Sequence, residues 1–568
     1  MLAATCKLPS RAPKQARATT ASRARLAPRS TTTPPPRTLT THLAANGETT
    51  PHAHTRDRRA AKRQQNDQGG VPTSSTALSA SKHAVVAAAA AEKPSLTPIK
   101  LVPAAASIAL GLAIRFLLPI PAGVTGQAWS LLSIFVGTIA GIVLNPLPVG
   151  AWSMCSVTLA LVTKTLTFQQ AFSAFTLDVV WLIVSVFFIA RAFVKTGLGN
   201  RVGFMFARFF GKTTLGLGYA LTAAEAIVAP GLPSTAARHG GVMLPVILSL
   251  SKACGSDPAK GTEKKMGAYL IQNSLQCCNL TSGIFLTGAA QNLLCARLAE
   301  AAGAVGITFG SWLLASCVPG FLALVLTPYV LFKIYPPEVT ETPDAPTMAA
   351  AKLEEMGPAT SGEKITLGVV ASLLFLWIFG PGLLGVSAPV TALLGLSALL
   401  CSGVISWQDC LQEKGAWDTL LWFSALVGMS AQLETFGIIS WLANNVSTML
   451  AGASMSWPMA FTVLHVAYFA IHYLFASQTA HVGALYAAFL AMMVGSGVPV
   501  LIAALTLSFS TNLFGAITHY ASAQGVVYYG AGYIDLPTWW KVGGIMALFQ
   551  YGVMFGVGAF WWKAIGLM

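Results

Sequence analysis

The chain has 568 residues, of which 54% are hydrophobic and only 10% charged, whereas soluble proteins carry about 25% charged residues. This composition excludes an ordinary soluble protein and indicates a polytopic membrane protein, because apolar windows of roughly 20 residues, the length that crosses a bilayer as a helix, recur from Leu101 to Met568. The formal net charge of +15 does not indicate a nucleic-acid partner, since most of it lies in the first 91 residues.

Residues 1–91 have the composition of a transit peptide. They hold fourteen Lys or Arg residues against Glu48, Asp57 and Asp67, a balance of +11 that leaves +4 for the rest of the chain. They are rich in Ala, Ser, Thr and Pro, and they lack the long apolar core of a secretory signal. The run from Ser30 to Pro36 favours a plastid address over a mitochondrial one, and the scarcity of acidic residues disfavours a disordered cytosolic tail.

Helices are predicted for the remaining chain, in about 12 to 14 segments that include hairpins entering and leaving the same face of the membrane. Strands are not expected, because the apolar runs lack an alternation of period two. The clearest predicted spans are Leu101–Ile120, Leu131–Leu147, Val179–Val194, Trp312–Leu331, Leu367–Leu384 and Val542–Phe560.

The helical part repeats one plan. Asp178 opens an apolar helix that leads on to Thr235, and Asp418 opens another that leads on to Thr479 over a similar stretch of chain. We therefore expect a first transmembrane half over residues 92–335, a solvated acidic linker over 336–364 and a second half over 365–568. The alternative is that membrane helices simply resemble one another in composition.

The first half contains a hydroxyl-bearing run, Pro233-Ser234-Thr235-Ala236, inside an apolar segment. The preceding prolines break a helix, so Ser234 or Thr235 is placed to cap a new half-helix whose positive end attracts a carboxylate. Arg238 follows one turn later, and a buried Arg marks either a substrate pathway or a structural pair, here with Glu225.

The second half contains Ser477-Gln478-Thr479-Ala480, where no proline forces a break. His481 follows this run and either binds an anion or satisfies a neighbouring carbonyl group. Each hydroxyl run precedes a further polar insertion, Asn279–Asn292 in the first half and Ser508–Gln524 in the second, which suit unwound backbone at membrane depth. Small-residue helix packing is the alternative for these insertions.

Other site chemistries find little support. The nine cysteines lie mostly alone in apolar runs, and the Cys277-Cys278 pair lacks metal-ligand spacing, so neither a disulfide framework nor a metal site is expected. Signatures such as HExxH or GxxxxGK[ST] are not present in the sequence, so no cofactor is expected.

On these residues the chain resembles the divalent-anion transporters of the dicarboxylate and citrate class, also called divalent anion:sodium symporters. In that family each inverted repeat has a Ser-Asn-Thr tip on a re-entrant hairpin and a later unwound helix, and the hydroxyl runs take the places of the two tips. Thr287 and Thr518 fall where the threonines of the unwound helices lie. The resemblance covers Leu101 to Met568 and implies an all-α, elevator-type transporter that forms homodimers.

The departures from the family pattern narrow the expected function. Ser234 and Gln478 replace the Asn of the tips, at positions that help to build sodium sites in the symporters, and the Pro-Pro pairs of the unwound segments are missing. With the plastid-type leader, the run Leu-Pro-Ser-Thr-Ala-Ala-Arg is most similar to chloroplast dicarboxylate translocators. This resemblance implies sodium-independent exchange of 2-oxoglutarate, malate and sometimes glutamate across the inner envelope.

We therefore predict an antiporter, not an enzyme, that works in membrane lipid on small dicarboxylate anions. The predicted substrate-binding residues are Ser234, Thr235, Ser477, Gln478, Thr479, Thr287, Thr518, Arg238 and His481. Alternatives are a glutamate/malate exchanger and a sodium- or proton-driven symporter. A remote alternative is an intramembrane hydrolase with Ser454 as nucleophile and His472 as base.

Overall fold

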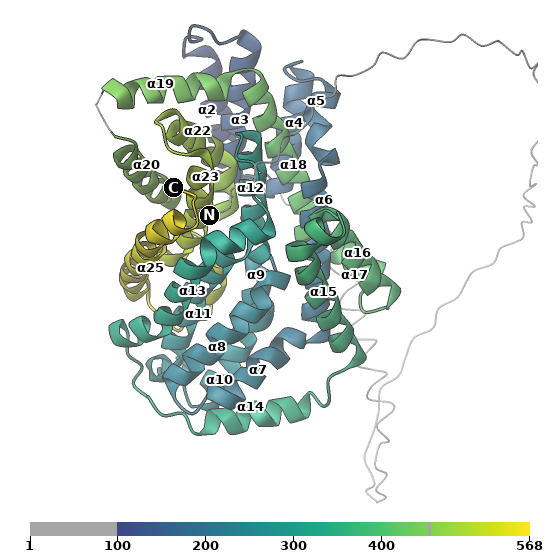
Figure 1. Cartoon of the computed structure of the whole chain (residues 1–568), viewed down its shortest axis with the longest axis vertical. Coiled ribbons are helices and arrows are strands. Elements are labelled where there is room, and N and C mark those ends of the chain that lie inside the picture. Colours follow the sequence, from purple (N-terminus) through teal and green to yellow (C-terminus); the bar gives the residue numbers. More distant parts are fainter. Residues whose placement is uncertain (1–98, 453–455) are drawn as a thin grey trace, which may run out of the picture. The chain divides into compact units, whose positions relative to one another are not determined.

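The computed structural model describes residues 99–452 and 456–568, and these residues form a bundle of helices (Figure 1). The expected leader lies outside the described residues. Within the described ranges no strand forms, and Thr213 and Glu341 make an isolated bridge. The predicted all-α membrane fold is therefore confirmed.

The helices before residue 336 make up the first series, which ends with the long helix α13. They are α2 (Leu101–Phe116), α3 (Gly126–Leu144), α4 (Val149–Val162), α5 (Phe168–Phe172), α6 (Asp178–Thr196), α7 (Leu198–Phe210), α8 (Thr214–Val228), α9 (Thr235–Arg238), α10 (Leu244–Ala253), α11 (Gly267–Ile284), α12 (Ala290–Ala301) and α13 (Phe309–Ile334).

A connecting helix, α14 (Asp344–Glu355), precedes the second series. The later helices are α15 (Ser361–Leu383), α16 (Ala388–Cys401), α17 (Trp407–Gln412), α18 (Lys414–Thr435), α19 (Ile438–Gly452), α20 (Trp457–Ile471), α21 (Gln478–His481), α22 (Ala487–Gly495), α23 (Val500–Leu513), α24 (Ala523–Tyr529) and α25 (Leu536–Ala564).

Six helical stretches in the described part are long and apolar enough to cross a membrane. They are Gly126–Leu144, Asp178–Thr196, Phe309–Ile334, Ser361–Gly380, Gln478–Gly495 and Leu536–Ala564. Large apolar side chains such as Leu548 and Phe560 are exposed, as expected for surfaces that face lipid. The predicted spans overlap five of these helices and α2, with shifted ends. α3, for example, stops at Leu144, short of the predicted Leu147, because Asn145 adopts a left-handed φ of 52°.

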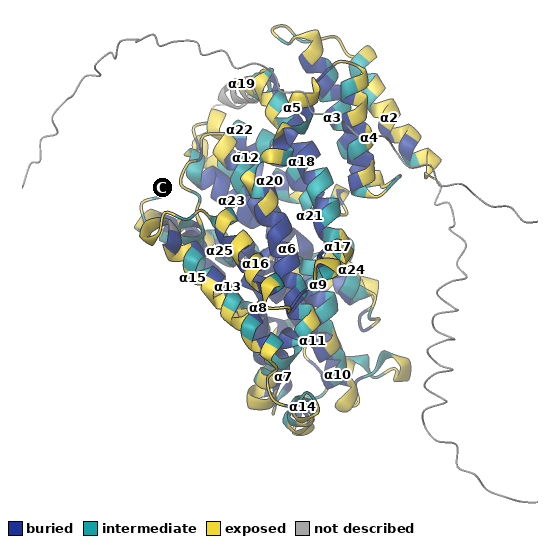
Figure 2. Ribbon diagram, turned by 90° about the vertical axis from the view of Figure 1, so that its right-hand side faces the viewer, coloured by how far each residue is buried: buried dark blue, intermediate teal, exposed yellow. Residues whose placement is uncertain are grey.

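The two series share one plan with a constant offset. α9 and α21 start at residues 235 and 478, the π-helical turns that follow them start at 239 and 482, and α10 and α22 start at 244 and 487. Each of these elements therefore follows its counterpart at the same distance along the chain. Figures 1 and 2 place α7, α8 and α10 towards one end of the bundle and α19, α20 and α22 towards the other, as in an inverted repeat.

The core of the bundle is the polar helix α11. All of its residues from Gly267 to Ile284 are buried, and α11 packs against α8, α13 and α23 (Figure 2). The halves also join through Asp418 in α18, whose Oδ1 accepts a hydrogen bond of 3.0 Å from the Gly150 N–H at the start of α4. A Cβ at Gly150 would lie 2.5 Å from that carboxylate oxygen, so this close approach requires glycine.

The segment predicted as a linker is tied to the first half. α14 packs on α7, and the Thr214 hydroxyl donates to the Val339 carbonyl at 2.6 Å. Arg201 of α7 donates from Nε to Glu363 at 2.5 Å and from Nη1 to the Gly357 carbonyl at 2.9 Å. Glu363 also accepts from the Thr360 N–H, in a capping box that starts α15.

We predict that Arg201→Met lowers the free energy of unfolding by about 1.5 to 3 kcal/mol, because Glu363 loses a charge-assisted partner in a largely buried place. The measurement is the apparent Tm in detergent, followed by tryptophan fluorescence. Lys352→Met is the matched control, since it breaks the exposed Lys352–Glu355 pair, worth less than about 1 kcal/mol. Equal losses of Tm in the two variants would contradict the prediction.

Candidate functional site

The first hydroxyl run forms the start of an interrupted helix, as predicted. Helix α8 stops at Val228, a short 3-10 turn covers Ala229–Gly231, and the chain then runs extended to Ser234. Ser234 is the N-cap of α9, where its Oγ accepts from the Ala237 N–H at 3.3 Å. The helix continues through the π-helical turn into α10, so residues 235–253 form one helix whose first N–H groups have no helical partner.

The second run forms the same structure without a proline. Helix α20 stops at Ile471, a 3-10 turn covers His472–Leu474, and the Ser477 Oγ accepts from the Ala480 N–H at 3.3 Å. Ser477 is exposed, whereas Ser234 is half-buried. At the constant offset Gln478 is the counterpart of Thr235, so the hydroxyls of Thr235 and Thr479 do not occupy equivalent positions. We call the two starts tip 1 (Ser234–Arg238) and tip 2 (Ser477–His481).

The two polar insertions interrupt their helices as predicted. A 3-10 turn at Leu286–Gly288 separates α11 from α12, and another at Phe514–Ala516 follows α23. Thr287 is buried and donates to the Pro230 carbonyl at 2.7 Å, so it joins the insertion to tip 1. Thr518 is also buried, and its Oγ1 has no hydrogen-bond partner in the part of the chain that the structure describes.

A belt of carboxamides joins tip 2 to both insertions. Gln478 donates to the carbonyl groups of Thr511 and Asn512 at 2.9 and 3.1 Å. Gln291 Nε2 lies 3.2 Å from Asn512 Oδ1, and Asn512 Nδ2 donates to Asn292 Oδ1 at 2.7 Å. Gln291, Asn292 and Asn512 were not among the predicted site residues, although they lie inside the predicted insertions. The sequence alone does not show that Gln291 and Asn292 contact Asn512, because these residues lie in different halves.

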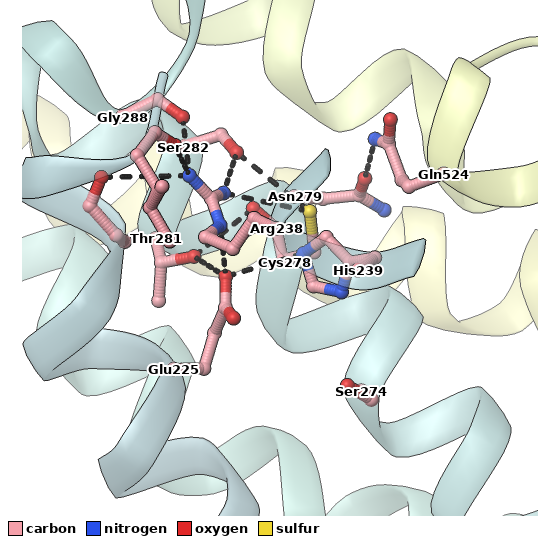
Figure 3. A network of polar contacts seen from close by, with 12 residues as sticks. Glu225, Arg238, His239, Ser274, Cys278, Asn279, Thr281, Ser282, Gly288 and Gln524 are labelled. Carbon is pink, nitrogen blue, oxygen red and sulfur yellow. Dashed lines mark hydrogen bonds and ion pairs between the residues drawn. The ribbon is translucent and has the colours of Figure 1, made fainter. Parts of the chain in front are cut away.

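Arg238 lies at the centre of a buried network that holds tip 1 (Figure 3). Its Nε is 2.8 Å from Glu225 Oε1, which confirms the expected pair. Its Nη1 donates to the carbonyl groups of Leu232 and Gly288 at 2.6 and 2.7 Å, and its Nη2 donates to Ser282 at 2.8 Å. One guanidinium group therefore satisfies carbonyls beside both interruptions of the first half, and substrate contact by Arg238 stays a prediction.

Glu225, His239 and Cys278 place potential metal ligands within 4.8 Å of one another. The cation among them is the Arg238 guanidinium, whose Nη2 lies 3.7 Å from the Cys278 sulfur. A metal ion there would face a fixed positive charge at close range, so the donor set suits an arginine better than a metal.

In the second half, at the same constant offset, His481 is the counterpart of Arg238, and Tyr468 is the counterpart of Glu225. The rings of Tyr468 and His481 meet edge to face with centroids 4.4 Å apart. His472 Nε2 donates to the Ala521 carbonyl at 2.9 Å, so its Nδ1 accepts from His481 Nδ1, 3.1 Å away. The nitrogen of His472 that could accept a proton is therefore already occupied by His481, which makes His472 unsuited as a hydrolase base. The proposed nucleophile, Ser454, lies outside the described residues.

Helices of the two halves lie beside one another near the tips. α24 packs against α9, and α12 packs against α21. Backbone N–H groups and hydroxyls at membrane depth, with no acidic side chain in either tip, favour a small anionic solute.

These features define a polytopic membrane protein with paired interrupted helices. A family model described as the sodium:sulfate symporter transmembrane region matches residues 99–568. The chain belongs to this family, which confirms the resemblance drawn from the tips.

Several curated relatives are similar over most of their length. Dicarboxylate transporter 2, chloroplastic, of Spinacia oleracea is 54% identical, with 84% of each chain covered. Dicarboxylate transporter 1, chloroplastic, of Arabidopsis thaliana is 45% identical over 82% of this chain and 83% of that protein. The putative malate transporter YflS of Bacillus subtilis is 46% identical over 83% of this chain and 97% of that protein. The expected multi-pass location in a chloroplast membrane is confirmed, and the family and these relatives are transporters.

We predict that Arg238→Gln lowers the free energy of unfolding by about 3 to 5 kcal/mol, because the buried Glu225 carboxylate is left without its cation. The double variant Glu225→Gln/Arg238→Gln should regain part of that loss. The check is a double-mutant cycle of apparent Tm values. Additive effects of the two substitutions would show that the ion pair does not hold tip 1.

Proposed function

We propose that the protein is a secondary transporter that exchanges dicarboxylates, 2-oxoglutarate for malate, across the chloroplast inner envelope without sodium. The observation that carries the proposal is the pair of serine-capped helix starts at Ser234 and Ser477, built alike at equivalent positions of the two series. The dicarboxylate transporters among the relatives support the substrate class.

A dicarboxylate has two negative ends, and the site offers two places for them. One carboxylate would bind at tip 1, with the free N–H groups and hydroxyls of Ser234 and Thr235. The other would bind at tip 2, with Ser477 and Thr479, while Gln478 and His481 support the tip from behind. Thr287 holds tip 1 in place, and Thr518 offers a hydroxyl not used by the described protein groups.

The contacts of Gln478 support transport without sodium. Its amide nitrogen donates to the carbonyl oxygens of Thr511 and Asn512, which are the kind of ligand that a hard cation needs. An N–H donor that faces those oxygens occupies one lone pair of each and puts the positive end of its dipole where a cation would bind. A sodium titration of uptake separates this exchanger from a sodium-coupled symporter of the same fold.

Exchange follows if the empty site resists reorientation. Without an anion the positive helix starts of the two tips lack a negative partner in a medium of low dielectric constant, which is unfavourable, and a bound dianion supplies that partner. The tips and insertions would move together against the remaining helices in an elevator-like step. We further propose that the protein does so as a homodimer in the lipid bilayer.

In proteoliposomes loaded with malate, external labelled 2-oxoglutarate should enter, and liposomes without an internal dicarboxylate should show little net uptake. The measurement is the initial rate of uptake with sodium and with potassium as the only cation. Comparable uptake into empty liposomes would contradict obligatory exchange, and a strict need for sodium would favour the symporter. Glutamate in the same assay tests the glutamate/malate alternative.

Thr235→Val and Thr479→Val should each raise the KM for 2-oxoglutarate about tenfold or more, because each removes a hydroxyl partner of a carboxylate. Thr462→Val is the matched control, since Thr462 is exposed and donates only within its own helix, to the Pro458 carbonyl. An unchanged KM would remove that threonine from the site.

A further inference from the structure

His239 continues the buried network into a chain of hydrogen bonds that the substrate site does not use. Its Nδ1 lies 2.6 Å from the Tyr528 hydroxyl, and that hydroxyl lies 2.6 Å from the Ser274 Oγ. On the other side of the ring, Nε2 is 3.3 Å from Glu225 Oε1. His239, Tyr528, Ser274 and Glu225 are all buried, and they come from four helical elements.

The Glu225 carboxylate determines which nitrogen of the neutral His239 ring carries the hydrogen. A bare Nε2 lone pair at 3.3 Å from the Glu225 carboxylate would be repelled, so Nε2 carries the hydrogen of the neutral ring, although this contact is not a hydrogen bond. The neutral ring then accepts at Nδ1 from the Tyr528 O–H, and Tyr528 in turn accepts from the Ser274 O–H. Both contacts of the Tyr528 hydroxyl are satisfied in this state.

The same chain is satisfied with one proton more. When Nδ1 is protonated it donates to the Tyr528 oxygen, the Tyr528 hydrogen turns to Ser274 Oγ, and the serine hydrogen turns to the carbonyl four residues earlier in α11. A proton delivered to the Ser274 hydroxyl thus becomes a proton on His239 by two hydroxyl transfers. No heavy atom moves, and the net change is one positive charge.

The groups around His239 fit such a site. The charged or titratable neighbours are Glu225 on α8, Arg238 in the same helix, Cys278 on α11 and Tyr528 on α24. Glu225 and Arg238 cancel each other, so the charge on His239 determines the net charge of the cluster. At the equivalent position the second half has Val482, so the site belongs to the first half alone.

The site lies close enough to the substrate to sense its charge, a step that rests on the proposed function. His239 follows Thr235 by four residues, about 6 Å along the helix. A negative charge at that range, in a partly polar interior, strengthens proton binding by roughly ten- to thirtyfold. We propose that His239 is a proton-binding site that fills when a dicarboxylate dianion occupies the tips and empties when a monoanion replaces it.

A proton on His239 also changes the charge that each exchange moves. A 2-oxo dicarboxylate carries two negative charges at neutral pH, and an amino dicarboxylate carries one. Exchange of one for the other moves a net charge unless a proton accompanies the dianion. A proton on His239 makes the two loaded carriers alike in charge, so the exchange becomes independent of membrane voltage.

The first test measures protons taken up when malate binds. The full-length protein in detergent is titrated with malate by calorimetry at neutral pH, in two buffers with different enthalpies of ionisation. The wild type should take up a substantial fraction of one proton per malate, and His239→Gln should take up close to none. Tyr528→Phe should also lower proton uptake, although it keeps the imidazole, because a protonated Nδ1 then has no acceptor in this buried place.

His465→Gln is the matched control, since His465 is another buried histidine, paired with Thr506 at 2.9 Å, and should leave proton uptake unchanged. A wild-type binding heat that is the same in both buffers would overturn the proposal. If malate does not bind to the wild type at all, the proposed function fails, which is a distinct outcome.

The second test measures transport in proteoliposomes. Malate inside is exchanged for external glutamate or aspartate at a clamped potassium diffusion potential. With the wild type, the interior should become more alkaline, and the rate of exchange should not depend on the membrane voltage. His239→Gln should move no protons and run two- to tenfold faster at an inside-negative potential of about 60 mV, because it then exports a net negative charge.

Malate/2-oxoglutarate exchange is the internal control for folding, because it moves no net charge and should stay voltage-independent in every variant. A uniform loss of rate without a change in voltage dependence would show that His239 has only a structural role. Wild-type exchange of malate for an amino dicarboxylate that depends on voltage would overturn the proposal.

Discussion

The structure depends on satisfying backbone groups where helices stop inside the membrane, and in the first half one buried guanidinium group does this. Arg238 reaches carbonyls beside both interruptions, and Glu225 balances its charge. Without these contacts the open carbonyls would face an apolar interior, where each costs several kcal/mol. The ion pair is thus a condition for the extended segment that exposes the N–H groups of tip 1.

In the second half, neutral side chains support the interrupted helix. Tyr468 and His481 replace Glu225 and Arg238 at the same positions, and His472 reaches the Ala521 carbonyl. A charged pair is strong but rigid, because separating it in a medium of low dielectric constant is costly. Aromatic contacts and neutral hydrogen bonds cost less to rearrange. The two tips therefore share a backbone design but differ in how tightly their supports hold them.

The sequence predicted most strongly what local chemistry determines. Pro230 and Pro233 stand close together around Gly231 and strongly favour a helix end, so tip 1 and its cap at Ser234 were predictable. Tip 2 has no such residue, and its break depends on contacts with residues far along the chain, such as Tyr473 with the Phe514 carbonyl. The carboxamide belt of Gln291, Asn292 and Asn512 also depends on contacts between the halves. The predicted connection over residues 336–364 was recognised by its polarity, but its docking on α7 rests on single side chains such as Thr214 and Arg201.

The bond between Asp418 and Gly150 bears on the order in which the protein assembles. The carboxylate that completes the start of α4 comes from a helix made 268 residues later. While the ribosome is still synthesising the second half, this N–H group lacks its carboxylate partner. The start of α4 is therefore completed only when α18 is in place.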